Sequence, residues 1–111
     1  MADLVPVNSS VNGVAMSLVA ATAGGDLCPQ AKRILLMIVN GGASPCNATV
    51  HGQNAACGDP SAHDEVTTVP AGATKIIGPF NRAMYNDSAD KLEIKYDQVS
   101  SVTIGAIEVA D

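Results

Sequence analysis

Residues 65–109 read EVTTVPAGATKIIGPFNRAMYNDSADKLEIKYDQVSSVTIGAIEV. In this stretch, short apolar runs alternate with Pro, Gly, Asn and Asp, the residues that form turns, at a nearly even spacing. Strands of this length and spacing are typical of an all-β sandwich or barrel. The stretch contains no set of side chains typical of an active site, so it indicates a structural module.

The second half of the chain predicts four strands. They are Val66–Val69, Thr74–Ile77, Lys91–Tyr96 and Val102–Val109. The alternation is clearest in the third, where Leu92, Ile94 and Tyr96 face one way and Lys91, Glu93 and Lys95 the other. One face of this strand should therefore meet water. In the last strand Val102, Ile104 and Ala106 should face inward, and Gly105 is the candidate position for a bulge.

The first half predicts three more strands, Val14–Ala21, Lys32–Asn40 and Cys46–Gln53. Residues 32–40 (KRILLMIVN) are apolar at odd and even positions alike, as in a central strand covered on both faces. A helix beginning at Pro29 is the alternative, because Pro is favoured at the first helical position. The β-branched residues and the turn at residues 40–42 favour the strand, with Cys46–Gln53 as its partner in a hairpin.

About eight such strands predict a single-domain antiparallel β-sandwich of jelly-roll or Greek-key type. We assign the sandwich to residues 13–111 and a short N-terminal arm to residues 1–12. The arm contains an apolar group made of Leu4, Val5, Pro6 and Val7. Such a segment either frays as a terminus or adds a strand to the sheet edge of a partner. These four residues are the predicted partner-binding residues.

The composition argues against several classes of ligand. Lys and Arg number 6 against 11 Asp and Glu, which gives a net charge of -5 and argues against nucleic-acid binding. The aromatic residues, two Tyr and one Phe with no Trp, are too few for a carbohydrate-stacking platform. No apolar run approaches the roughly 20 residues of a membrane-spanning helix. Residues 14–23 imitate a signal peptide, but no Lys or Arg precedes them, so a strand is the better interpretation.

The cysteines are odd in number: Cys28, Cys46 and Cys57. A disulfide-stapled secreted domain usually has an even set. We therefore expect buried free thiols in a reducing cytosol. A bridge between Cys46 and Cys57 is the alternative.

The sequence contains one cluster of soft metal ligands: Cys46, His51, Cys57 and His63, with Asp64 beside them. Thiolate and imidazole suit zinc, but the spacing contains neither a CxxC nor an HxxxH pair. Cys46 and His51 are an odd number of residues apart, so on one strand they would point to opposite faces. The pattern predicts no metal and no other cofactor.

Two further patterns bear on chemistry. Residues 86–90 (NDSAD) resemble a calcium loop but lack its central Gly and distant Glu, so they predict turn chemistry. There is no GxSxG motif around a nucleophilic serine. We therefore expect that the protein is not an enzyme.

Several turn and strand patterns together resemble a protein family. They are residues 69–74 (VPAGAT), 77–80 (IGPF), 85–87 (YND), the final hairpin, and residues 34–43 (ILLMIVNGGA) upstream. In these the chain resembles small β-sandwich proteins of tailed bacteriophages, of the capsid decoration or minor capsid type. The resemblance covers roughly residues 30–109 and rests on no catalytic signature.

The resemblance implies a virion structural protein that binds the outside of the head and stabilises the shell. It implies the major capsid protein as partner, a homo-oligomer with a trimer favoured, and assembly into virions in the host cytoplasm. It implies neither nucleic-acid nor membrane binding. Two alternatives stay open: a head–tail joining or tail component, and a small metal-binding enzyme that uses the four Cys and His residues named above.

Overall fold

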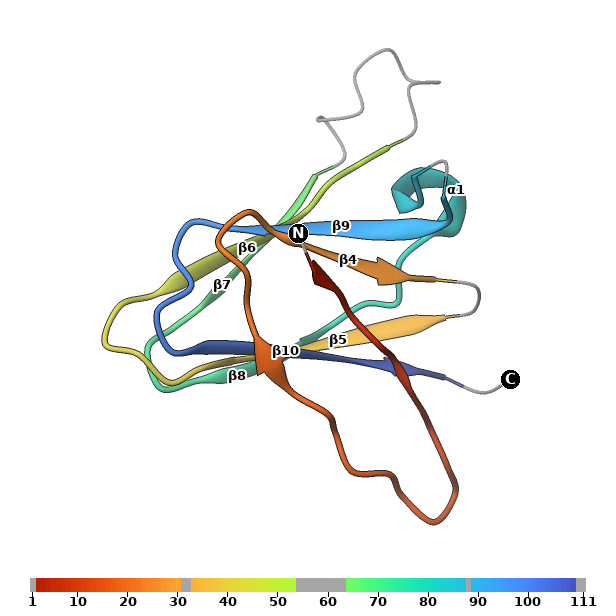
Figure 1. Ribbon diagram of the computed structural model, residues 1–111, viewed down its shortest axis with the longest axis horizontal. Coiled ribbons are helices and arrows are strands. Elements are labelled where there is room, and N and C mark those ends of the chain that lie inside the picture. The colour runs from red at the N-terminus through yellow and green to blue at the C-terminus, as the bar shows by residue number, and fades with distance from the viewer. Residues whose placement is uncertain (1, 31–32, 54–63, 88, 110–111) are drawn as a thin grey trace.

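The computed structural model describes residues 2–30, 33–53, 64–87 and 89–109, which form an all-β sandwich (Figure 1). The first sheet contains β1 (Ala2–Asp3), β4 (Asp26–Pro29), β9 (Lys91–Tyr96), β6 (Cys46–Val50) and β7 (Glu65–Val69), in that spatial order. The second contains β2 (Val7–Asn8), β10 (Val102–Glu108), β5 (Ile34–Asn40) and β8 (Thr74–Ile77), with β3 (Val19–Ala20) also paired to β10. The predicted sandwich is confirmed.

Strands β3 to β10 have the topology of a jelly roll. In one sheet β4, β9, β6 and β7 are neighbours, and in the other β3, β10, β5 and β8 are neighbours. All these pairs are antiparallel. Among these eight strands, only β6 and β7 are consecutive strands of one sheet, and every other connection crosses to the opposite sheet. This is the order of the eight-stranded jelly roll. The arm strands β1 and β2 add to it in parallel.

The core lies between the two sheets and uses the inward positions that the alternation predicts. In β9, Leu92 and Ile94 are fully buried and Lys95 is exposed. In β10, Val102, Ile104 and Ala106 are buried, as predicted. The two sheets thus share one apolar layer, as in other β-sandwiches.

The segment expected to be strand or helix is the strand β5. Its burial alternates strictly: Ile34, Leu36 and Ile38 are buried and the residues between them half-buried. Its outer face is therefore only partly covered, contrary to the expectation of two covered faces. Half-buried apolar side chains on that face explain why the sequence lacks alternation.

The predicted hairpin between β5 and the strand after it is wrong. Strand β6 pairs with β7 and β9 in the opposite sheet. The reason lies in Asn40, whose buried side-chain amide donates to the carbonyl oxygens of Ser44 (2.8 Å) and Val69 (2.9 Å). Because Val69 belongs to β7, these bonds draw the turn across to the other sheet.

The predicted strand Val14–Ala21 is wrong over most of its length, because only Val19–Ala20 pairs. Residues 16–18 lie instead on the outer face of β10 at Gly105, where a Cβ would meet the Ser17 oxygen at 2.7 Å. The register between β10 and β5 runs through Gly105 without interruption, so no bulge is present there. Instead, the lack of a side chain at Gly105 lets the backbone of Ser17 pack closely against β10.

Outside the N-terminal arm, two elements were not predicted. Strand β4 begins with Asp26, a residue that is rare in strands, and its side chain is buried because it accepts a 2.8 Å hydrogen bond from the Tyr96 hydroxyl. The second element is α1 (Arg82–Tyr85), a single helical turn between β8 and β9. The backbone N–H of Tyr85 closes it by donating to the Asn81 oxygen.

Candidate interaction surface

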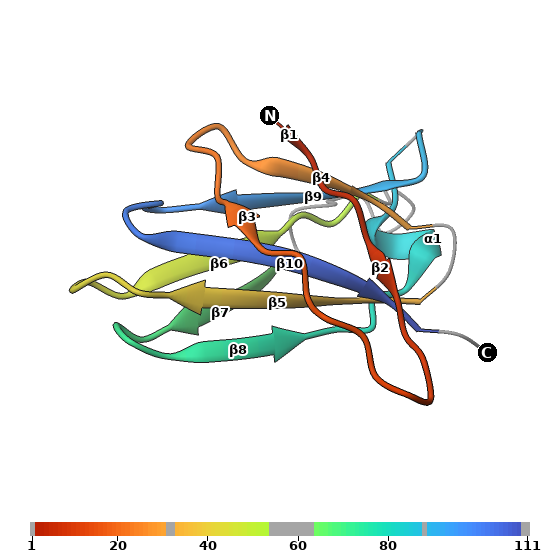
Figure 2. The same cartoon turned by 60° about the horizontal axis from the view of Figure 1, so that its bottom comes forward.

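The N-terminal arm bridges the two sheets along one side of the sandwich. Figure 2 shows β1 beside β4 and β2 beside β10. The Lys91 ammonium lies 3.3 Å from the Asp3 carboxylate, and the Ser9 N–H donates to the Glu108 oxygen over 2.9 Å. The arm therefore covers sheet edges of its own domain.

The predicted partner-binding residues divide into two groups. Leu4 is 3% exposed and belongs to the core, and its N–H donates to the Leu27 oxygen over 2.7 Å. Val5 is 81% exposed, whereas Pro6 and Val7 are half-buried. In this conformation Val5 is available to a partner and Leu4 anchors the arm. Binding by these four residues stays a prediction.

Between β2 and β3 the chain forms a loop that projects from the body of the sandwich (Figures 1 and 2). Its tip is a turn in which the Gly13 N–H donates to the Ser10 oxygen over 2.9 Å, with Gly13 at φ +86°. Val11 stands at a corner of this turn with its side chain fully exposed. A turn corner normally carries a polar residue or Pro. The exposed apolar side chain of Val11 is therefore unusual at this position.

Exposed apolar side chains are concentrated in the N-terminal segment of the chain. Seven large apolar side chains of the described residues are exposed, and five of them lie between residues 5 and 19. These five, Val5, Val11, Val14, Leu18 and Val19, we name the N-terminal apolar surface. The sequence from Leu4 to Gly25 has no charged residue. Exposed apolar groups without charges among them are characteristic of the core of a protein–protein interface.

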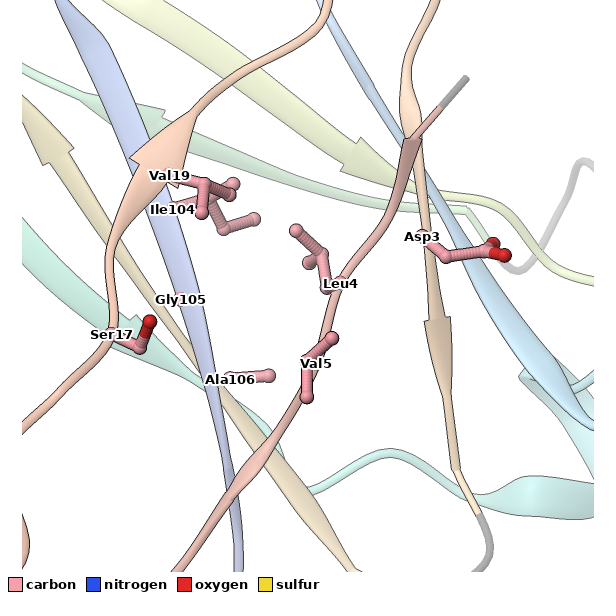
Figure 3. A pocket seen from close by; sticks show the side chains of 8 residues that line it. All are labelled: Asp3, Leu4, Val5, Ser17, Val19, Ile104, Gly105 and Ala106. Atoms are coloured by element: carbon pink, nitrogen blue, oxygen red, sulfur yellow. The ribbon is translucent and has the colours of Figure 1, made fainter.

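A small cavity opens within this region, over the edge of β10. Its volume is about 150 Å³, and its lining includes Leu4, Val5, Val19, Ile104 and Ala106. In Figure 3 the Asp3 carboxylate points away from these apolar side chains. Strand β3 pairs with residues 103–104 of β10 and β2 pairs with residues 107–108, which leaves Gly105 and Ala106 paired with β5 alone. The cavity marks the gap between the two short pairings.

A larger cavity lies on another part of the molecule, at the start of β7 and the end of β8. Its volume is about 300 Å³, and Glu65, Thr67, Ile77, Pro79, Phe80 and Tyr85 line it. The Phe80 and Tyr85 rings meet edge to face with their centroids 5.6 Å apart. Burial raises the pKa of Tyr85, and the nearby Glu65 and Asp64 carboxylates and a hydrogen bond to Glu65 raise it further.

The candidate metal ligands are only partly described. The His51 Nδ1 lies 3.3 Å from the Asp64 Oδ2, and the Asp64 Oδ1 accepts a 2.7 Å hydrogen bond from the Gly52 N–H. Cys57 and His63 lie outside the described residues. Within the described ranges, no three His, Cys, Asp or Glu side chains are placed to hold a metal ion. Asp64 therefore bonds both His51 and Gly52, the two residues that follow β6.

Cys28 and Cys46 are buried free thiols, as expected, so Cys46 forms no bridge to Cys57. Burial raises the pKa of Cys28 to about 12. Burial also raises the pKa of Cys46, whose thiol donates to the Gln98 oxygen. A protonated buried thiol is a weak nucleophile, so both groups belong to the core.

The predicted turn chemistry of residues 86–90 is confirmed. The Asp87 Oδ1 accepts hydrogen bonds from the backbone N–H groups of Ala89 (2.8 Å) and Lys91 (3.1 Å). Asp90 adopts φ 59°, which Asp tolerates better than most residues. The oxygen atoms of this segment therefore cap the start of β9.

Both the projecting loop and the larger cavity escaped the sequence analysis. The charge-free run from residue 4 to residue 25 was a usable signal for the loop. The cavity had no such signal, because its residues come from three separate segments.

Comparison with known proteins adds no further assignment: no family model, no curated protein and no solved structure matches the chain. No helix among the described residues is long and apolar enough to cross a membrane.

Proposed function

We propose that this protein is a structural component of a bacteriophage virion, a decoration protein that binds the outside of the head and stabilises the shell. The major capsid protein is its partner, and its role is adhesion without catalysis. The proposal joins the sequence resemblance over residues 30–109 to a jelly-roll sandwich.

One observation carries the proposal: the N-terminal apolar surface, exposed and free of charge on a chain of net charge -5. Water-exposed Val and Leu side chains gain free energy when a partner covers them, at about 25 cal/mol per Å². Each copy would contribute a modest interface, and a closed oligomer would multiply it by avidity. A trimer is the expected oligomer.

The test uses heads assembled from the major capsid protein of the same phage. The purified chain should cosediment with these heads and raise the temperature at which they break open. A Val11→Asp, Val14→Asp double variant should bind at least about tenfold more weakly, because charge at an apolar contact must be desolvated. Val66→Asp is the matched control, since Val66 is 61% exposed and lies on β7 outside the N-terminal apolar surface.

Two results would overturn the proposal. Cosedimentation with tails rather than heads would favour the tail or joining alternative. Equal loss of binding in Val66→Asp and the double variant would show that the N-terminal apolar surface is not the contact. Sedimentation velocity of the chain alone tests self-association separately.

A further inference from the structure

The cavity at the start of β7 and the end of β8 combines aromatic groups with a carboxylate. The chain has three aromatic residues, and two of them, Phe80 and Tyr85, line this one cavity. Glu65 lines it too and is exposed, so its carboxylate meets solvent. None of the described residues that line it is Lys or Arg. Among these described residues, the charged group is the Glu65 carboxylate, which lies beside the two rings.

The walls of the cavity are held in place by backbone packing. A Cβ on Gly78 would lie 2.7 Å from the Ile34 oxygen and 3.2 Å from the Phe80 ring. Only glycine fits this contact, and its φ of +115° is one that residues with side chains rarely adopt. On the other side, the buried Tyr85 packs edge to face on Phe80 and bonds Glu65. The two rings are thus held in place before any ligand arrives, with the Glu65 carboxylate beside them.

Electrostatics select the class of ligand. A carboxylate next to aromatic faces attracts a cation through its charge and through the negative ring faces. Arginine suits such a site better than lysine, because its planar guanidinium stacks on rings while donating N–H bonds to a carboxylate. The Tyr85 hydroxyl occupies part of the hydrogen-bonding capacity of Glu65 and leaves the rest for a guanidinium.

We propose that this cavity binds an arginine side chain presented by a partner protein, with Glu65 as the anion and Phe80 and Tyr85 as the stacking walls. The proposal is independent of the virion role. It uses a surface distinct from the N-terminal apolar surface, so either proposal can fail alone.

The experiment is a titration of the isotope-labelled full chain, followed by amide NMR spectra. The probe is N-acetyl-arginine amide, and the control ligand is N-acetyl-citrulline amide, which has nearly the same shape without the charge. The arginine compound should shift the amide signals of Glu65, Thr67, Phe80 and Tyr85 with a millimolar dissociation constant. The citrulline compound should leave them unchanged.

Variants identify the groups responsible. Glu65→Gln keeps an acceptor for the Tyr85 hydroxyl and should weaken arginine binding about tenfold. Glu93→Gln is the matched control, because Glu93 lies on β9 and does not line the cavity, and it should bind arginine as the parent chain does. Phe80→Leu keeps an apolar wall but removes the ring, and should also weaken binding.

Dispersed spectra confirm that each variant is folded. Absence of shifts, equal binding of the citrulline compound, or unchanged binding in folded Glu65→Gln would overturn the proposal. Equal binding of N-acetyl-lysine amide would overturn the assignment to arginine.

Discussion

The carbonyl oxygen of Ser17 lies so close to Gly105 that a Cβ at position 105 would stand 2.7 Å from it. The Met16 and Leu18 side chains would each lie 3.0 Å away. Side chains can rotate away from a new methyl group, but the Ser17 oxygen belongs to the backbone and moves only with its segment. This one glycine therefore decides whether residues 16–18 can rest on β10.

A Gly105→Ala substitution should lift residues 16–18 off the sheet. We expect a loss of stability of about 1–3 kcal/mol, the usual cost of overpacking, together with faster proteolysis between residues 9 and 18. Urea denaturation and timed protease digestion measure the two effects. Gly24→Ala is the control, because nothing lies within 4 Å of a Cβ there. Unchanged digestion in Gly105→Ala would contradict the close packing.

Leu4 should anchor the arm to the core. Leu4→Ala removes most of a side chain that is 3% exposed. Such truncations lower the free energy of unfolding by about 2–5 kcal/mol when the site unfolds only with the whole domain. Because the arm can detach alone, we expect a cost near the lower end, about 2 kcal/mol. Hydrogen exchange should accelerate at the Leu4 and Ser9 amides, which donate to Leu27 and Glu108.

Val5→Ala is the comparison for this variant, since Val5 is 81% exposed and its truncation should change stability by less than about 0.5 kcal/mol. Equal effects of the two substitutions would show that the arm is not anchored by Leu4.

The strands of the sandwich could be predicted from the sequence where one face of the strand is exposed to solvent. Strand β9 alternates Lys and Glu with Leu and Ile, and the structure buries the predicted side. The sequence-based predictions failed where a side chain of one sheet forms hydrogen bonds with the other sheet. Asn40 bonds Val69 in the opposite sheet, and its turn sequence looks like that of a hairpin because such tertiary bonds leave no local pattern.

The N-terminal region was harder to predict for a related reason. Val14, Met16 and Leu18 alternate as in a strand, yet Met16 and Leu18 pack on Gly105 instead of pairing. The arginine site could not be predicted at all. Its residues Glu65, Phe80 and Tyr85 are brought together by the crossing from β7 to β8 and by α1, and no motif links them in the sequence.

The Tyr96–Asp26 hydrogen bond should contribute more to stability than the Tyr85–Glu65 bond. Asp26 is fully buried, its Oδ2 accepts from Tyr96 at 2.8 Å, and its Oδ1 has no partner among the described residues. Tyr96→Phe would leave a buried carboxylate with the Thr22 N–H at 3.2 Å as its remaining donor. We expect a cost of about 1–3 kcal/mol.

Tyr85→Phe removes the same hydroxyl from a pair whose carboxylate, Glu65, is exposed and can bond water instead. We expect a cost below about 1 kcal/mol for this variant. Chemical denaturation of both variants measures the difference. A larger loss in Tyr85→Phe than in Tyr96→Phe would contradict the assigned burial of the two pairs.

Alkaline pH should destabilise the fold through Cys28. Burial raises the pKa of this thiol from 9.0 to about 12, so between these values the unfolded chain loses a proton that the folded chain retains. Below pH 9.0 the Cys28 thiol is protonated in both states, and the free energy of unfolding is unaffected by its ionisation. Between pH 9.0 and about 12 this free energy falls by about 1.4 kcal/mol per pH unit for one such group. The pKa of Tyr96 is raised by burial and by Asp26, which extends the decline to higher pH.

Urea unfolding across the alkaline range measures the slope. Cys28→Ala should be less stable at neutral pH but should show a shallower decline, because it lacks the titrating thiol. Parallel curves for the two proteins would mean that another group causes the alkaline loss.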